Sequence, residues 1–143
     1  MSQSQPWKIW IDSEIVQNLL DISIDKFGGL RSKPKGGCVD GALGNAYTAE
    51  LYSMPEVEDE TVISGLCFCG YLLFYLSTAH CWSDGNKRVA WQSTMWALYR
   101  LGLTIDASDE EVIDFSYQIA DGRITKGEDA VNWIAERLAE VQE

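Results

Sequence analysis

The stretch TVISGLCFCGYLLFYLSTA, residues 61–79, contains no charged residue and decides the fold class of this chain. Its length approaches that of a membrane-spanning helix. However, it contains Ser, Thr, Tyr and Gly, it follows the acidic segment PEVEDE, and no basic residues flank its start. These features favour a buried helix in the core of a globular protein.

The hydrophobic spacing before this stretch is also helical. We expect helices over residues 12–26 and 39–52, because apolar residues recur there at helical intervals. Asp12 or Ser13 is suited to cap the first of these helices, since its side chain can accept from a free amide of the first turn. Gly28 is suited to end it, because glycine tolerates the left-handed conformation.

Three more helices are expected after the apolar stretch. The first covers residues 86–101 and is apolar almost all round, so it should be central. Ser108 opens a capping box for a helix that runs to about residue 120. A second box at Thr125 opens a last helix over residues 129–141.

The predicted fold is therefore all-α, a single domain of about six helices. It spans residues 1–143, with its core over about residues 12–141. The short segments LTID and GRIT could pair as small strands, and the sequence leaves this open. No repeat or interdomain linker is visible.

The composition narrows the function classes. The formal net charge is −11 at pH 7, which argues against direct binding of nucleic acid, because that binding neutralises phosphates with Lys and Arg. The first ten residues hold one Lys and no apolar signal region, so we expect a cytoplasmic protein without a membrane segment. An acidic surface favours solubility and also suits a basic partner.

The four cysteines make a zinc site improbable. Cys67 and Cys69 lie two residues apart in an expected helix, so they point to different faces and make a poor metal pair. We predict that all four, Cys38 and Cys81 included, are reduced and mostly buried thiols of a cytosolic protein.

The segment HCWSDGNKR, residues 80–88, joins the two most apolar expected helices and contains the only histidine of the chain. The following helix should start at Asn86, where the amides of the first turn are free and carry partial positive charge. Gly85 adds no side chain there, so an anion can approach the backbone. Lys87 and Arg88 add full charges, and together these features predict a phosphate site.

The other residues of this segment add reactive groups. Asp84 is suited to hold Mg²⁺, a hard ion that favours oxygen ligands. Asn86 can donate to a phosphate oxygen or cap the helix. His80 is suited to take a proton from a hydroxyl, because imidazole titrates near neutral pH. The set predicts transfer of a phosphoryl or nucleotidyl group to a hydroxyl.

A purely structural interpretation stays open, because Asp-Gly-Asn is ordinary turn chemistry and a lone histidine between helices is often structural. Against it stands the charge pattern. Basic residues in the first turn of a helix oppose its dipole, whereas the two expected helices after it begin with acidic residues. Locally unfavourable charge beside His80 is typical of a functional site.

The segment resembles the signature of Fic/Doc proteins: His, any residue, an aromatic, any residue, an acid, Gly or Ala, Asn, Gly or Lys, and Arg. The ending Lys87-Arg88 resembles the Doc (death-on-curing) branch. The segment DKFGGLRSKPKGGCVDGAL, residues 25–43, also looks like the corresponding part of Doc proteins. The resemblance covers roughly residues 12–140 and implies a Fic/Doc-like bundle.

The resemblance implies a toxin of a type II toxin–antitoxin system that transfers the γ-phosphate of Mg-ATP to a protein hydroxyl. The target of Doc toxins is a threonine of translation elongation factor Tu. Position by position, His80 would be the base and Asp84 the magnesium ligand. Phosphates would be held by Gly85, Asn86, Lys87 and Arg88, and the loop would be fixed by the buried ring of Trp82.

The resemblance also implies a separate inhibitor. Doc toxins pair with a Phd-type antitoxin whose tail binds across the helices near the active site. The inhibitory helix that silences many Fic proteins has no counterpart string in this chain. The basic loop Gly28–Gly37 would flank the site and grip nucleotide or target, or it is simply solvated.

Two departures separate this chain from Fic-type AMP transferases. Lys87 stands where those proteins have Gly, and Trp91 stands where they have a second Arg. Both changes disfavour AMP transfer, because they narrow the anion site and remove a phosphate ligand. Transfer of AMP to a protein hydroxyl remains an alternative, as does a non-catalytic binding module with the Fic fold.

Overall fold

The computed structural model describes residues 11–29, 33–52, 60–83 and 85–141. These residues form six α-helices and two short strands, which confirms the predicted all-α bundle of about six helices. In chain order, the elements are α1 Ser13–Phe27, α2 Cys38–Tyr52, α3 Glu60–Ala79, α4 Asn86–Arg100, β1 Leu103–Ile105, α5 Asp109–Ala120, α6 Gly127–Ala135 and β2 Leu138–Glu140.

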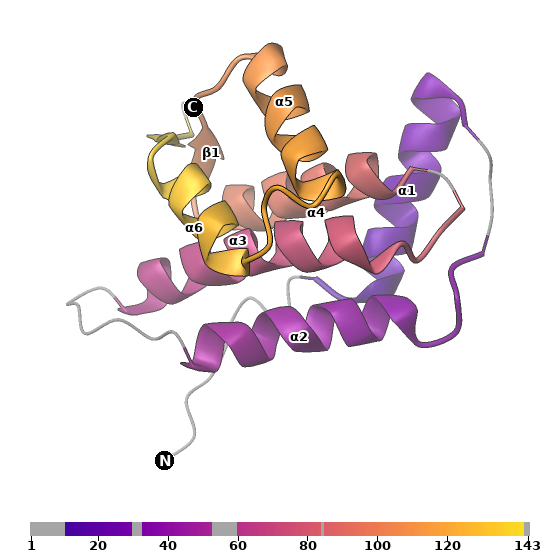
Figure 1. Cartoon of the computed structure of the whole chain (residues 1–143), viewed down its shortest axis with the longest axis horizontal. Helices are drawn as coiled ribbons and strands as arrows, with labels where there is room; N and C mark the ends of the chain where they lie inside the picture. Colours follow the sequence, from indigo (N-terminus) through magenta and orange to yellow (C-terminus); the bar gives the residue numbers. More distant parts are fainter. Residues whose placement is uncertain (1–10, 30–32, 53–59, 84, 142–143) are drawn as a thin grey trace.

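Helix α3 forms the centre of the core, as the uncharged stretch over residues 61–79 predicts. It packs against α2, α4 and α6, and Figure 1 shows α2 on one side of α3 and α4, with α5 and α6 on the other. Phe68, Leu72, Leu73 and Leu76 are completely buried. None of the helices in the described residues is long and apolar enough to cross a membrane.

A close approach of two helix backbones fixes α6 on α3. A β-carbon added to Gly70 would lie 2.5 Å from the α-carbon of Val131. A β-carbon on Gly127 would similarly lie 2.5 Å from Cδ1 of Tyr71. The hydroxyl of Tyr71 also donates to Oε2 of Glu128, at 3.2 Å. The two helices can therefore pack this closely only because glycine occupies positions 70 and 127.

Two of the predicted helix starts are confirmed. Asp12 is the N-cap of α1 and accepts from the amide of Ile15 at 2.9 Å. Ser108 and Glu111 form the complete capping box of α5, with the Glu111 amide donating to Oγ of Ser108 at 3.1 Å. Gly28 ends α1 with φ 84°, as expected for a glycine C-cap.

The prediction for the last helix is wrong at both ends. Its N-cap is Lys126, which has extended backbone and makes no side-chain cap, so the expected box at Thr125 does not form. The helix then ends at Ala135, and residues 138–140 leave it to form β2. This strand pairs antiparallel with β1, which places Leu138 opposite Ile105. The segment LTID thus becomes a strand, but its partner is the end of the chain rather than GRIT.

The prediction of four reduced cysteines is wrong for Cys38 and Cys81, which form a disulfide. They are 43 residues apart in sequence, and only the packing of the start of α2 beside the end of α3 brings their α-carbons to 5.5 Å. Cys67 and Cys69 are free, and burial raises the pKa of the Cys69 thiol. The cysteines therefore do not support the expectation that the protein resides in a reducing compartment.

The close approach of α3 and α6 generates a stability prediction. Replacing Gly70 by Ala should lower the free energy of unfolding by about 2 kcal/mol, because the added methyl group meets backbone atoms that cannot move aside. The matched control is Gly44→Ala in α2, where a β-carbon has no neighbour within 4 Å. It should raise the free energy of unfolding by about 1 kcal/mol. Urea denaturation measures both, and equal effects would contradict the proposed packing.

Candidate functional site

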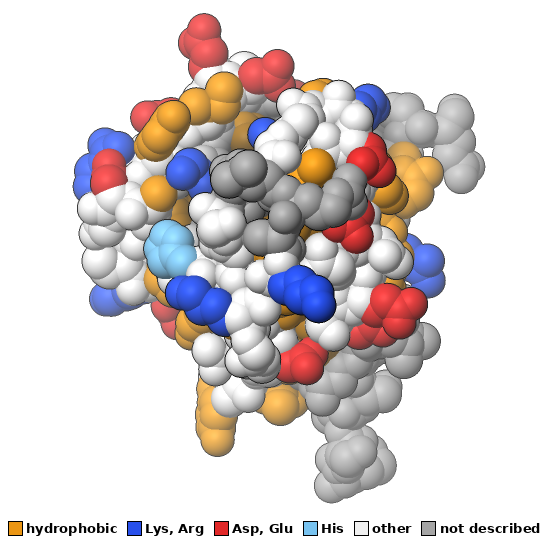
Figure 2. All heavy atoms as spheres, turned by 90° about the vertical axis from the view of Figure 1, so that its right-hand side faces the viewer, with side chains coloured by type: hydrophobic (Ala, Val, Ile, Leu, Met, Phe, Trp, Pro, Cys, Tyr) orange, Lys and Arg blue, Asp and Glu red, His pale blue; other side chains and the backbone are white. Residues whose placement is uncertain are grey.

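His80 directly follows α3 and has an unusual backbone conformation. Its φ is 51°, and it is the only residue other than glycine with positive φ in the part of the chain that the structure describes. This left-handed position after a helix normally holds glycine, and for another residue it costs about 1 kcal/mol. The side chain is exposed, and Figure 2 shows the imidazole at the surface with Lys and Arg side chains on the same face.

The loop that follows His80 is anchored on two sides. The side chain of Trp82 is 3% exposed, and its indole nitrogen donates to Oε1 of Gln17 in α1 at 3.1 Å. On the other side, Cys81 is disulfide-bonded to Cys38, and its carbonyl accepts from the amide of Lys35 at 2.9 Å. The basic loop before α2 therefore contacts the loop after α3 through Lys35; residues 30–32 of this basic loop fall outside the described residues.

Asn86 closes the loop through its side chain. Its Oδ1 accepts from the backbone amide of Trp82 at 3.1 Å, and its Nδ2 donates to the carbonyl of Trp82 at 2.7 Å. The sequence offered two roles for Asn86, phosphate contact or helix cap. Both ends of its amide instead bond to Trp82, so Asn86 holds the loop in shape beside the predicted anion site.

Gly85 is required where the loop enters α4. It is the N-cap residue, with φ 84° and ψ 6°, and a β-carbon there would lie 2.9 Å from Cδ1 of Leu20. Among the described residues, no side chain caps this helix, and its first turn contains no acidic residue. Within the described residues, the first turn of α4 thus lacks the acidic side chains that would neutralise its helix dipole.

The two basic residues of the first turn of α4 take different directions. Lys87 places its Nζ 5.5 Å from the ring centre of Tyr117 in α5. Arg88 reaches the end of α1, where its Nη1 donates to the carbonyl of Gly28 at 2.9 Å. A guanidinium has five N–H donors, so this contact leaves others that can face a ligand.

A hollow of about 380 Å³ lies at this point, and we call it the His80 hollow. Its lining is Ser77, His80, Ser83, Gly85, Asn86, Lys87, Arg88 and Ala120. The structure thus brings together all the predicted site residues except Asp84, which lies outside the described residues. Ser77 of α3 also lines the hollow, and no signal in the sequence singled it out.

The described lining of the His80 hollow fits a phosphate better than it fits a metal ion. It offers hydroxyl oxygens from Ser77 and Ser83 but no carboxylate. Within the described ranges, no group of three or more His, Cys, Asp or Glu side chains could hold a metal. Since Mg²⁺ prefers carboxylate oxygens, a magnesium site here depends on Asp84.

A second cavity, of about 320 Å³, adjoins the hollow and shares Lys87 and Arg88 with it. We call it the Trp91 pocket; its other lining residues are Trp91, Gln92, Val112, Ile113, Ser116 and Tyr117. The Trp91 indole donates to Oγ of Ser116 and so joins α4 to α5. Oε1 of Gln92 is buried and has no hydrogen-bond partner among the described residues.

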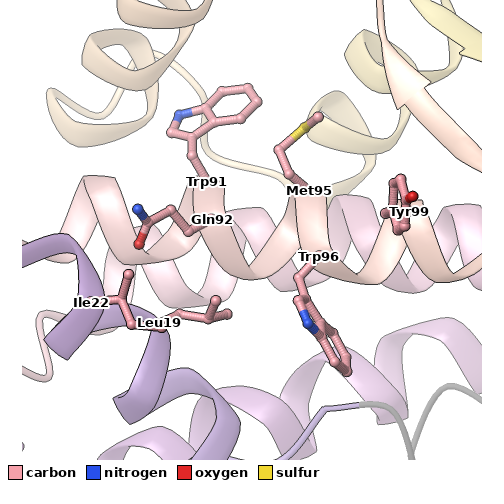
Figure 3. A pocket seen from close by; sticks show the side chains of 7 residues that line it. All are labelled: Leu19, Ile22, Trp91, Gln92, Met95, Trp96 and Tyr99. Carbon is pink, nitrogen blue, oxygen red and sulfur yellow. The ribbon is translucent and has the colours of Figure 1, made fainter. Parts of the chain in front are cut away.

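An apolar groove of about 420 Å³ lies on the side of α4 that faces α1. Figure 3 shows that its side chains come only from these two helices. They are Leu19, Ile22, Trp91, Gln92, Met95, Trp96 and Tyr99. Ile22 and Tyr99 are 59% and 65% exposed, so the groove is open to solvent and can receive an apolar partner.

The backbone of His80 generates a prediction that separates fold from function. His80→Gly should raise the free energy of unfolding by about 1 kcal/mol, because glycine adopts φ 51° without strain. The control is Thr48→Gly, at an exposed position within α2, which should lower it by about 0.5 kcal/mol. Thermal and urea denaturation measure both, and a destabilised His80→Gly protein would show that the imidazole serves the fold.

The chain matches no protein-family model, and a search of curated proteins finds no match. The chemistry of the His80 hollow is therefore judged from its own residues: an exposed imidazole, a helix start without a cap, and two cations.

Proposed function

We propose that this chain is a Doc-like toxin of a type II toxin–antitoxin system, which transfers the γ-phosphate of Mg-ATP to a hydroxyl of a protein target. The observation that carries the proposal is the composition of the His80 hollow. An exposed imidazole, in a conformation that disfavours histidine, shares this hollow with the uncapped start of α4 and its two cations. Strained residues of this kind are typical of functional sites.

In the proposed reaction, His80 accepts the proton of the target hydroxyl. The hydroxyl oxygen forms a bond to the γ-phosphorus, the bond from that phosphorus to the β–γ bridging oxygen breaks, and ADP leaves. Lys87, Arg88 and the first-turn amides of α4 would stabilise the charge on the phosphates. Asp84 would hold Mg²⁺, which neutralises phosphate charge when bound.

The adjoining cavities support a nucleotide as the ligand. The His80 hollow is lined mostly by polar groups and suits phosphates, whereas the Trp91 pocket is mostly apolar. The aromatic rings of Trp91 and Tyr117 suit the flat ring of a nucleotide base. Lys87 and Arg88 lie where the two cavities meet.

The proposed partners follow from the resemblance and from the surface. The target would be elongation factor Tu, and the inhibitor would be a Phd-type antitoxin. The apolar groove between α1 and α4 suits the tail of that antitoxin. Helix α4 contains Lys87, Arg88 and Arg100 but no acidic residue. A partner with apolar residues and acidic flanks would therefore complement this face.

ATP labelled at either the α- or the γ-phosphate tests the proposed transfer. Incubation with cell extract should carry label into protein only from the γ-position. His80→Asn should reduce this transfer by about 100-fold or more, because asparagine tolerates the left-handed backbone but cannot act as the base. Circular dichroism verifies that the variant is folded.

Other outcomes of this assay are equally decisive. Label that enters protein only from the α-position would show AMP transfer instead. Transfer from neither position by a folded protein would favour a non-catalytic binding module. Normal transfer by His80→Asn would exclude His80 as the base.

The apolar groove generates a prediction about inhibition. Met95→Asp should leave transfer from labelled ATP unchanged but prevent inhibition by the antitoxin, because a carboxylate in the groove opposes an apolar and acidic partner. The matched control is Tyr52→Asp on α2, since Tyr52 is 89% exposed and lies outside the groove. Inhibition curves with the proposed Phd-type antitoxin measure the difference. Equal inhibition of both variants would place the antitoxin elsewhere.

A further inference from the structure

We propose that the Cys38–Cys81 disulfide controls the His80 hollow by its redox state. The protein is active when the bond is formed, and its activity falls when the bond is reduced. The bond joins the first residue of α2 to the residue that directly follows His80. The statement about activity rests on the proposed function. The statement about the conformation of His80 stands without it.

The disulfide is placed to determine the backbone of His80. Helix α3 ends at Ala79, and by Cys81 the chain must already be directed at the start of α2, with the two cysteine α-carbons 5.5 Å apart. His80 is the single residue between these fixed points, and it has φ 51°. When the disulfide is broken, the side chain of Cys81 is no longer held to α2. His80 can then relax toward negative φ, which moves the imidazole relative to α4.

Other contacts limit the change to this part of the loop. The amide of Lys35 still donates to the carbonyl of Cys81, and the indole of Trp82 still donates to Gln17. Asn86 still bonds both backbone polar groups of Trp82. Reduction should therefore change the position of His80 and leave the helices packed.

The structure also indicates which sulfur reacts. Cys81 is 1% exposed, whereas Cys38 is only partly buried. The thiolate of a dithiol reductant would attack Sγ of Cys38 and form a mixed disulfide, and Cys81 would leave as a thiolate and take up a proton. The second thiol of the reductant then displaces Cys38. Two electrons pass to the protein, which gains two thiols, and the reductant becomes a disulfide.

The single histidine provides a direct measurement of this change. Because the chain contains only one imidazole, its two C–H signals in the proton NMR spectrum need no assignment among histidines. Reduction of the intact protein with a dithiol should shift these signals, while circular dichroism stays helical and the mass rises by two hydrogens. The signals of Cys38→Ser should match those of the reduced protein and should not respond to the reductant.

A control variant separates this disulfide from the other cysteines. Cys67→Ala/Cys69→Ala removes the two free thiols and should respond to reduction like the wild type. Three results would overturn the inference: four alkylatable thiols in unreduced protein, unchanged imidazole signals in fully reduced protein, or loss of helical structure on reduction. If Cys38→Ser does not fold, the reduced wild type still provides the comparison.

The activity measurement distinguishes the two proposals. Transfer from γ-labelled ATP should fall about fivefold or more on reduction, because the conformation of His80 is no longer held against relaxation. The control variant should lose activity to the same degree. If neither redox state transfers label, the proposed function fails, and the imidazole signals still decide the redox inference. If reduction shifts the imidazole signals but leaves transfer of label unchanged, the proposed control of activity by the disulfide is wrong.

Discussion

The burial of Trp82 is the constraint on which the functional end of the molecule depends. This side chain is almost completely buried, and its indole hydrogen bonds to α1. The backbone on either side of the ring is then held by Asn86 and by the disulfide of Cys81. With the loop fixed from inside, the residues at its two ends remain available to solvent. His80 lies at one end and Lys87 at the other.

The start of α4 contrasts with other helix starts of the same molecule. Helices α1 and α5 have side-chain caps and acidic residues in their first turns, which neutralise the helix end. Helix α4 begins at a left-handed glycine, without a side-chain cap among the described residues, and its first turn holds cations. Helix α6 also lacks a side-chain cap but has Glu128 and Asp129 in its first turn, whereas the only charged residues in the described first turn of α4 are cations. The start of α4 adjoins the only imidazole.

The sequence predicted the helices well because their signals are local. Apolar periodicity and capping residues such as Asp12 and Ser108 act within a few neighbouring residues, and the structure has both caps. The most apolar stretch forms the core helix because its side chains leave water only when other elements pack around it. Most residues around the His80 hollow were also predictable, since they lie within one short segment, but Ser77 of α3 and Ala120 of α5 were not. Their chemical roles stay predictions.

The parts that the sequence could not predict depend on contacts between distant residues. The disulfide needs Cys38 and Cys81 to meet, and no local rule reports this. The last helix stops early because residues 138–140 gain backbone hydrogen bonds from β1, which outweigh local helix preference. The side chain of Asn86 could reach a phosphate or the loop, and only the folded geometry shows that it bonds to Trp82.

The open start of α4 also links the free energy of the folded state to the surrounding solution. Lys87 and Arg88 lie at the positive end of the α4 dipole, and an anion bound there would offset this unfavourable arrangement. Any species that binds only the native chain shifts the folding equilibrium by mass action. If the proposed nucleotide binds at this helix start, the resistance of the protein to heat would rise with the concentration of that polyphosphate.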